Sequence, residues 1–184
     1  KMYSKDDILP PIRCDEEIKT RHSVFDAYAK HEESINFSKD ACRERVIPSY
    51  MGLISELDAN IGRLIKFLEN EGKIDDTIIV LTSDHGDYLG DHWLGEKELF
   101  YESAIRIPMI IIDPGHEASP TRGTSIDEFV ESIDLIPTFL EMAGSPHNHD
   151  HILEGRSLLP LLHSNLEHPW RDATFCEMDY CIRH

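Results

Sequence analysis

The most regular pattern of apolar and polar positions lies between Pro48 and Gly72. Apolar side chains recur there at steps of three and four residues: Tyr50, Leu53, Ile54, Leu57, Ile61, Leu64, Ile65 and Leu68. This spacing places them on one face of an amphipathic helix. Pro48 and Ser49 suit its first turn, because a backbone N–H has no partner there and a serine oxygen can cap the helix. Gly72 suits its end, because glycine adopts the left-handed conformation that often terminates a helix. We therefore expect a helix over residues 48–72.

Two short apolar runs follow this helix. Residues 77–83 and residues 107–112 are β-branched and apolar without alternation. Such runs are typical of strands covered on both faces, as in a parallel sheet flanked by helices. Residues 132–144 predict another helix, with Pro137 in its first turn and Gly144 at its end. The order helix, strand, loop, strand indicates an α/β fold.

The other segments carry weaker patterns. Residues 1–47 are polar and charge-rich, with weak helical periodicity over residues 15–30. Residues 146–154 form a histidine-rich segment, whose His147, His149, Asp150 and His151 we interpret as a solvated loop rather than a metal cluster. Residues 174–180 are compatible with one more strand.

Composition limits the classes of partner. The chain has 184 residues, 40% of them hydrophobic, which is enough to bury a core. Its 18 Lys and Arg oppose 35 Asp and Glu, for a formal charge of −17. This balance argues against binding to nucleic acid or to an anionic membrane, which requires clustered cations. The longest apolar runs are about four residues, far below the roughly 20 of a membrane-spanning helix.

The first residue and the cysteines bear on the compartment. The sequence begins with Lys1 and shows no signal-peptide pattern, so we expect it to have been cut from a longer protein. Four cysteines, at positions 14, 42, 176 and 181, form no CxxC pair and are expected to be reduced thiols. We expect a cytoplasmic location, with the periplasm as the alternative.

The residues that carry chemistry lie between Ser83 and Lys97. Asp84 and His85 follow a predicted strand, at the edge where α/β sheets bind ligands. Gly86 allows a sharp turn, so that both side chains can converge on one ion. Carboxylate and imidazole donors suit one divalent metal, namely Mn²⁺, Ca²⁺ or Mg²⁺, with Zn²⁺ possible. The alternative is a capped turn with a hydrogen-bonded histidine.

Further residues of this segment have two interpretations each. Lys97 stands among five acidic residues and either clamps an anionic substrate group or serves as a surface counter-charge. Asp91 and His92 either orient the metal ligands or make ordinary loop hydrogen bonds. Tyr88 and Trp93 either line a substrate pocket or pack under the loop.

These motifs, taken in order, resemble a known family. Ser-Asp-His-Gly at 83–86, Leu-Gly-Asp-His at 89–92, Lys97, and Arg-Ile-Pro at 106–108 are similar to the C-terminal half of sulfatases and phosphonate monoester hydrolases, in the alkaline phosphatase superfamily. The resemblance covers residues 45–165. It implies the C-terminal part of an alkaline-phosphatase-like α/β sandwich, a sheet flanked by helices, with the N-terminal half missing. It divides the chain into a lead-in (1–47), the sulfatase-like part (48–165) and a truncated end (166–184).

The resemblance also implies roles for individual residues. Asp84 and His85 would be metal ligands, and Lys97 would bind the sulfuryl or phosphoryl oxygens of the substrate. Substrates would be small phosphonate, phosphodiester or sulfate esters, and the parent protein would be a homo-oligomer. The family's nucleophile is a formylglycine hydrate made from a Cys/Ser-x-Pro-x-Arg motif, attacking while the metal neutralises charge.

The nucleophile motif is absent from the sequence. Cys14 and Cys42 lack a proline two residues on, and in Ser119-Pro120-Thr121-Arg122 the proline comes one position early. We therefore expect this chain to be an inactive piece of a metal-dependent hydrolase. The alternative is a non-catalytic metal-binding or interaction domain, a degenerate relative of the family.

Overall fold

The computed structural model describes residues 2–145 and 154–177. The chain divides into two compact units. The first unit contains Lys1–Gly72 and Thr82–Met109, and the second contains Lys73–Leu81 and Ile110–His184. The helices of the first unit are η1 (Lys5–Asp7), α1 (Asp15–Thr20), α2 (Ser23–Tyr28), α3 (Glu32–Phe37), α4 (Asp40–Asn70), η3 (Asp91–Trp93) and α5 (Glu102–Ile105).

Helix α4 is longer than the apolar repeat predicts. It begins at Asp40 instead of Pro48, and Pro48 lies buried inside it. The expected start was wrong because a proline already has a helical φ and removes only one backbone hydrogen bond, a loss that surrounding contacts can outweigh. The predicted end is confirmed: the helix reaches Asn70, and Gly72 has a φ of +64°.

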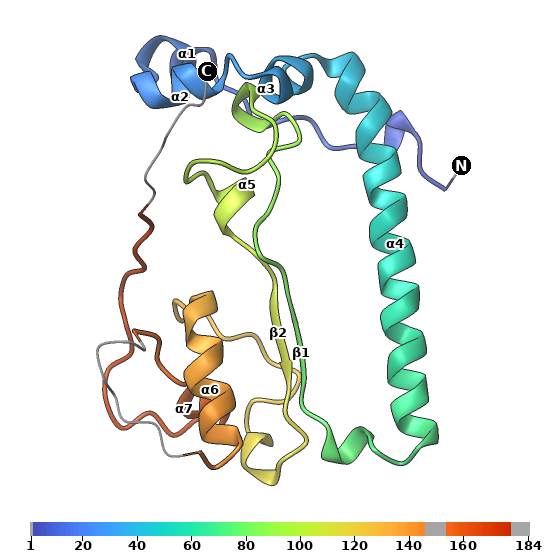
Figure 1. Cartoon of the computed structure of the whole chain (residues 1–184), viewed down its shortest axis with the longest axis vertical. Helices are drawn as coiled ribbons and strands as arrows, with labels where there is room; N and C mark the ends of the chain where they lie inside the picture. Colours follow the sequence, from blue (N-terminus) through green and yellow to red (C-terminus); the bar gives the residue numbers. More distant parts are fainter. Residues whose placement is uncertain (1, 146–153, 178–184) are drawn as a thin grey trace. The chain divides into compact units, whose positions relative to one another are not determined.

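The second unit contains most of the sheet. Strands β1 (Ile79–Thr82) and β2 (Met109–Ile112) lie inside the two predicted segments and are paired. The chain ascends along β1 and descends along β2, so the pair is antiparallel rather than parallel (Figure 1). Among the described residues the strands are not covered on both faces, because Ile110 and Ile112 are exposed. Residues 83–108 form the long connection between β1 and β2.

The remaining elements of the second unit include the predicted helix over residues 132–144. They are η2 (Ile74–Asp76), η4 (His116–Ala118), η5 (Ser132–Asp134), α6 (Leu135–Met142) and α7 (Leu159–Leu162). Pro137 lies in the first turn of α6 and Gly144 has a φ of +65°, as predicted. Asp134 is fully buried and accepts hydrogen bonds from the Arg156 amide (2.8 Å) and the Arg171 guanidinium (2.6 Å). This carboxylate therefore joins α6 to the following segment.

Two predictions concern the last segments. Residues 174–177 form no strand, and residues 178–180 lie outside the described part of the chain. The histidine-rich cluster at positions 147, 149, 150 and 151 lies outside it as well.

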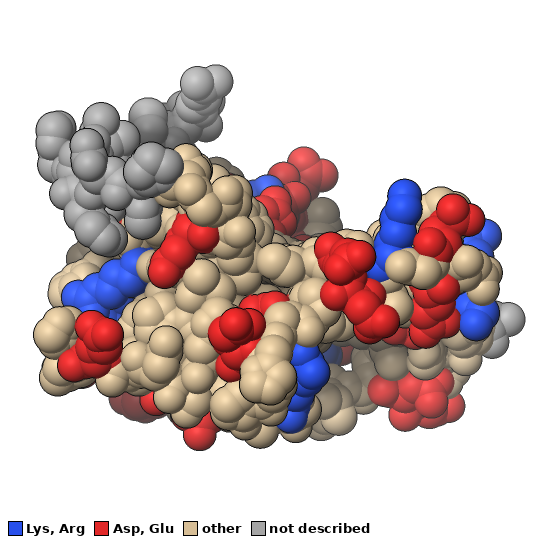
Figure 2. Space-filling view, turned by 90° about the horizontal axis from the view of Figure 1, so that it is seen from below, with Lys and Arg blue, Asp and Glu red and all other residues tan. Residues whose placement is uncertain are grey.

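Among the described residues, no helix has the length and apolar character needed to cross a membrane. On the face shown in Figure 2, Asp and Glu side chains are interspersed with Lys and Arg side chains, and the described residues form no continuous basic patch there.

Candidate metal- and anion-binding site

Asp84 and His85, here termed the ligand pair, follow β1 almost directly. The strand ends at Thr82, and the hydroxyl of Ser83 donates to the carbonyl of His85 (2.9 Å), which fixes the turn. The Asp84 side chain is 83% exposed and the His85 side chain 39% exposed. Both side chains are therefore accessible to an ion or a ligand from solution.

The hydrogen bonds of the ligand pair orient its donor atoms. His85 Nδ1 lies 2.7 Å from the carbonyl oxygen of Gly86, which can only accept, so Nδ1 carries the hydrogen. In the neutral ring, Nε2 then presents a lone pair, and it lies 3.3 Å from Asp84 Oδ2. The backbone N–H of His85 donates to Asp84 Oδ1 (3.0 Å), and this bond chiefly holds the pKa of Asp84 below its usual value. The lowered pKa favours the ionised form of the Asp84 carboxylate, which lies directly beside the imidazole ring.

Gly86 has a different role from the one expected. The backbone around it approaches α5 closely: its N–H donates to the carbonyl of Ala104 (2.7 Å), and a Cβ at this position would lie 2.0 Å from the carbonyl oxygen of Ser103. Gly86 is not among the residues with positive φ. Glycine is therefore required here for space beside α5 and not for a left-handed turn.

Lys97 lies further along the site loop, which we define as residues 84–98. Its side chain is exposed, and no hydrogen bond or ion pair is found for it within the described ranges. Burial raises the pKa of Asp87, and the positive charge of Lys97 partly opposes this rise. Lys97 is thus a cation in the same loop as the ligand pair, with its ammonium group accessible.

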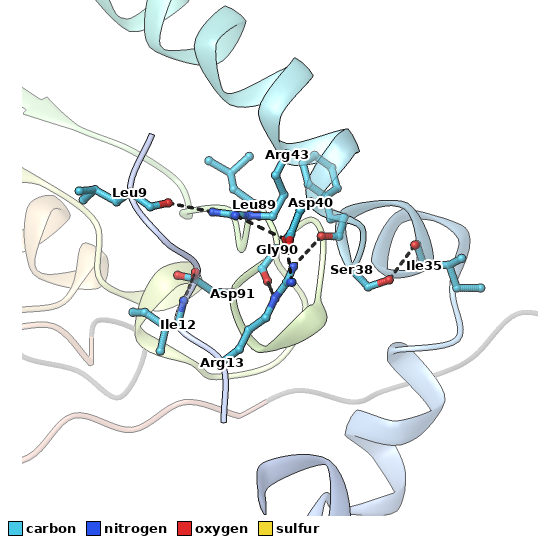
Figure 3. Close-up of polar contacts among 11 residues, drawn as sticks. Leu9, Ile12, Arg13, Ile35, Ser38, Asp40, Arg43, Leu89, Gly90 and Asp91 are labelled. Atoms are coloured by element: carbon cyan, nitrogen blue, oxygen red, sulfur yellow. Dashed lines mark hydrogen bonds and ion pairs between the residues drawn. The ribbon is translucent and has the colours of Figure 1, made fainter. Parts of the chain in front are cut away.

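Two arginines from the N-terminal segment hold the centre of the site loop (Figure 3). Arg43, only 5% exposed, donates from Nε to the carbonyl of Leu89 (2.9 Å) and from Nη2 to that of Leu9 (3.1 Å). Arg13 donates from Nε to the carbonyl of Gly90 (2.8 Å). Its guanidinium also lies 5.6 Å from the ring centroid of Trp93, so this tryptophan packs under Arg13.

Asp91 and His92 make hydrogen bonds to residues outside the ligand pair. Asp91 Oδ1 accepts from the amide of Ile12 (2.8 Å), and Oδ2 accepts from the hydroxyl of Ser103 (2.9 Å). His92 Nδ1 lies 2.6 Å from a carboxylate oxygen of Glu17. These contacts correspond to the alternative left open by the sequence, in which the two residues secure the loop itself.

The backbone of the site loop is strained. Four residues of the loop other than glycine have positive φ, namely Leu89 (47°), His92 (54°), Trp93 (57°) and Glu96 (59°), and so does Leu99 (79°) directly after it. Such conformations are costly for residues with a Cβ, and they persist only where the surroundings impose them. Hydrogen bonds from residues 9–43 supply that constraint, and strain of this kind is characteristic of functional sites.

The ligand pair is incomplete as a metal site. Among the described residues, no group of three His, Cys, Asp or Glu side chains is arranged to hold an ion. Cys14, Cys42 and Cys176 are free thiols, and Cys181 lies outside the described part of the chain. Asp84 and His85 could therefore supply two ligands of a larger set.

The comparisons with solved structures identify the class of fold. The phosphonate monoester hydrolase SpPMH from Silicibacter pomeroyi superposes with a TM-score of 0.81 at 32% sequence identity, over 93% of this chain and 35% of that protein. The α/β fold is therefore that of the alkaline-phosphatase-like hydrolases, and the chain spans about a third of the length of this structure.

The sequence comparisons identify the family. The Sulfatase family profile matches residues 19–145. The chain is 34% identical over 191 aligned positions to the multifunctional alkaline phosphatase superfamily protein PehA from Trinickia caryophylli, covering 97% of this chain and 36% of that protein. It is 33% identical to an arylsulfatase from Clostridium perfringens, covering 93% and 34% respectively. The chain belongs to the sulfatase family and spans about a third of the length of these relatives.

The sequence alone did not identify the residues that hold the site loop. Residues 1–47 suggested no chemistry, yet Arg13, Glu17 and Arg43 from that segment contact the loop directly. No local signal distinguishes these three from other charged residues, because their partners lie about 50 to 80 positions later in the chain.

Proposed function

We propose that this chain supplies metal- and anion-binding residues to a hydrolase of sulfate esters, phosphonate monoesters or phosphodiesters. Asp84 and His85 would bind one divalent ion, and Lys97 would bind an oxygen of the sulfuryl or phosphoryl group. The proposal rests on family membership and on the site loop, which holds a carboxylate beside an imidazole and an accessible ammonium group.

The arrangement of the ligand pair is the observation that carries the proposal. When His85 is neutral, its Nε2 and Asp84 Oδ2 are both acceptors, and they lie 3.3 Å apart. Two such atoms repel each other unless a cation or a proton lies between them. Neighbouring ligands of a Mg²⁺, Mn²⁺ or Ca²⁺ ion are roughly 3 to 3.5 Å apart, given the usual bond lengths. The Nδ1–H bond to a carbonyl is also the usual way in which a metal-binding histidine is oriented.

Each residue then has a specific task. A bound divalent ion would neutralise charge that develops on the transferred group. Asp84 and His85 would hold that ion at the edge of the sheet, and Lys97 would orient the substrate by its anionic oxygens. The nucleophile and the remaining ligands would come from other parts of a longer protein, because the chain contains no Cys/Ser-x-Pro-x-Arg motif.

The metal assignment can be tested in the full-length protein. We expect Asp84→Asn and His85→Ala each to lower the bound metal, measured by elemental analysis after dialysis, because each removes one of few ligands. Asp58→Asn, an exposed carboxylate on α4, is the matched control and should leave the metal content unchanged. Metal content equal to that of the wild type in both site variants would show that the assignment is wrong.

The substrate class requires a separate measurement. Tetrahedral sulfuryl and phosphoryl groups present similar oxygens to a metal and a lysine, so neither the ligand pair nor Lys97 distinguishes them. Rates of the full-length protein on an aryl sulfate and on an aryl phosphonate monoester, measured side by side, would determine the preference. If the full-length protein hydrolysed neither ester, that result would contradict the proposed function.

A further inference from the structure

Tyr88 is a buried tyrosine within the site loop. It is only 1% exposed, and its ring packs edge-on against Tyr101, with the centroids 6.1 Å apart at an interplanar angle of 83°. A side chain so deeply buried does not line a substrate pocket, which resolves the alternative left open by the sequence. Any effect of Tyr88 on chemistry must therefore act through other residues.

The polar groups of Tyr88 hold the backbone on both sides of Lys97. The N–H of Tyr88 donates to the carbonyl of Glu96 (2.8 Å), and its hydroxyl donates to the carbonyl of Glu98 (2.6 Å). Burial raises the pKa of Tyr88 above its ordinary value, so the hydroxyl retains its proton. One residue thus restrains the carbonyl groups of the two residues that flank Lys97.

Local preference alone does not explain the conformation of this segment. Glu96 has a φ of 59°, a region that residues with a Cβ rarely adopt. The neighbouring carbonyl of Gly95 accepts from the Tyr28 hydroxyl (2.7 Å), which adds a second restraint. The backbone under Lys97 therefore depends on hydrogen bonds from buried tyrosines.

The Lys97 side chain depends on that backbone for its position. It is exposed, and no hydrogen bond or ion pair is found for its ammonium group in the part of the chain that the structure describes. A lysine stem has four flexible carbons and large rotamer entropy. The position of its Cα is therefore the main restraint on the region that the ammonium group can reach.

We propose that Tyr88 is a positioning residue for Lys97, acting through the carbonyls of Glu96 and Glu98. The proposal rests on the proposed function, because it takes Lys97 to be the group that binds the anionic part of the substrate. Tyr88 itself contacts neither the substrate nor the ligand pair. The hydrogen bond of the Tyr88 hydroxyl determines where the Lys97 ammonium group lies when the ester is bound.

Tyr88→Phe tests the hydroxyl while keeping the packed ring. In the full-length protein we expect kcat/KM for the ester substrate to fall about five- to tenfold. One lost hydrogen bond would account for this decrease, because it would leave the Lys97 ammonium group less well positioned for the substrate. Tyr3→Phe is the matched control, because it also removes a tyrosine hydrogen bond, from Tyr3 to Ser55 (2.7 Å), away from the loop. The control should keep kcat/KM within about twofold of the wild type.

A double-mutant cycle with Lys97→Ala distinguishes positioning from a merely structural role. If Tyr88 acts through Lys97, Tyr88→Phe should lower kcat/KM in the wild-type background and have almost no effect in the Lys97→Ala background. An equal decrease in both backgrounds would overturn the positioning role and leave the proposed function intact. A Lys97→Ala variant with wild-type kcat/KM would overturn the proposed function instead, and this proposal with it.

A second readout needs no activity. Competitive acylation of lysines, quantified by mass spectrometry, reports the environment of the Lys97 ammonium group. Tyr88→Phe should change the labelling rate of Lys97 at least about twofold relative to Lys66 on α4, whereas Tyr3→Phe should not. Unchanged Lys97 labelling, together with unchanged amide exchange over residues 95–99, would overturn the proposal whatever the protein hydrolyses.

Discussion

At the scale of single residues, two glycines show how position determines the consequence of the same substitution. Gly86 lies in the site loop directly after the ligand pair, where a Cβ would meet the carbonyl oxygen of Ser103 at 2.0 Å. Gly62 lies on α4, where a Cβ would meet nothing within 4 Å. Gly86 is required because there is no room for a side chain, whereas Gly62 only lowers the stability of α4.

We therefore predict opposite effects for the two alanine variants of the full-length protein. Gly86→Ala should lower the free energy of unfolding by about 1–3 kcal/mol, because backbone cannot move aside as a flexible side chain can. Gly62→Ala should raise it by about 0.5–1 kcal/mol, because alanine favours the helix. Urea denaturation monitored by circular dichroism measures both, and equal effects of the two variants would contradict the described packing at Gly86.

Asp113, directly after β2, gives a pH-dependent prediction. Its carboxylate lies 3.0 Å from His163 Nε2 and accepts from the Gly115 amide (2.7 Å). Burial alone raises the pKa of Asp113, but these bonds outweigh it and the net pKa lies below the ordinary 3.8. Because the folded-state pKa is lowered, the ionised group contributes stability above the unfolded pKa, and that stability is lost as the pH falls through the folded pKa.

The stability difference between the wild type and Asp113→Asn should therefore shrink as the pH falls from about 5 to about 3. Denaturant unfolding at a series of pH values would measure it. A difference that stays constant over this range would show that the carboxylate is not stabilised by its partners in the folded protein.

At the scale of elements, α4 and the site loop are joined by one buried side chain. Arg43 projects from the first turns of α4, and its guanidinium bonds the carbonyls of Leu9 and Leu89 (Figure 3). The early start of α4, before Pro48, is therefore what brings this guanidinium to the loop. Further along the helix, much of the predicted apolar face remains exposed, including Leu53 and Leu57.

Arg43→Ala and Arg45→Ala provide a matched pair on this helix. Arg43→Ala should destabilise the full-length protein by about 2–4 kcal/mol, because it removes charge-assisted hydrogen bonds from a buried guanidinium to two part-buried carbonyls. Arg45 is exposed, and its removal should change stability by less than about 0.5 kcal/mol. Thermal and urea unfolding would measure both variants. Comparable stabilities would argue against Arg43 as the group that holds the loop.

At the scale of the whole molecule, the chain holds two candidate metal ligands and one candidate anion-binding lysine, all three in one loop. The ligand pair and Lys97 lie in the first compact unit, and the described residues supply no third metal ligand to them. The chain covers about a third of the relatives that it matches, including 36% of PehA. Under the proposed function, the charge of −17 would not prevent binding of an anionic ester, because a bound ion and Lys97 would reverse the local potential.

The isolated 184-residue chain should accordingly hydrolyse neither an aryl sulfate nor an aryl phosphonate monoester, with or without added Mn²⁺, Ca²⁺ or Mg²⁺. The measurement is the release of the aryl product, with the full-length protein as the positive control. A metal-dependent rate that disappears in Asp84→Asn would contradict this prediction, and it would require a nucleophile within the chain.

Several features were determined by the sequence because they are encoded locally. The three- and four-residue repeat predicted most of α4, short β-branched runs predicted β1 and β2, and glycines marked the ends of α4 and α6. The contiguous motif from Asp84 to Lys97 indicated the candidate ligands, and its order indicated the family that the comparisons later identified. Neighbouring residues suffice for such signals, because period and spacing depend only on nearby positions.

Other features were decided only by the tertiary structure. The start of α4, the antiparallel pairing of β1 with β2, and the close approach at Gly86 depend on contacts between distant segments. Arg13 reaches Gly90 across 77 positions, and Glu17 reaches His92 across 75. Such contacts leave no local pattern, because any exposed arginine or glutamate looks the same in the sequence until the chain brings its partner beside it.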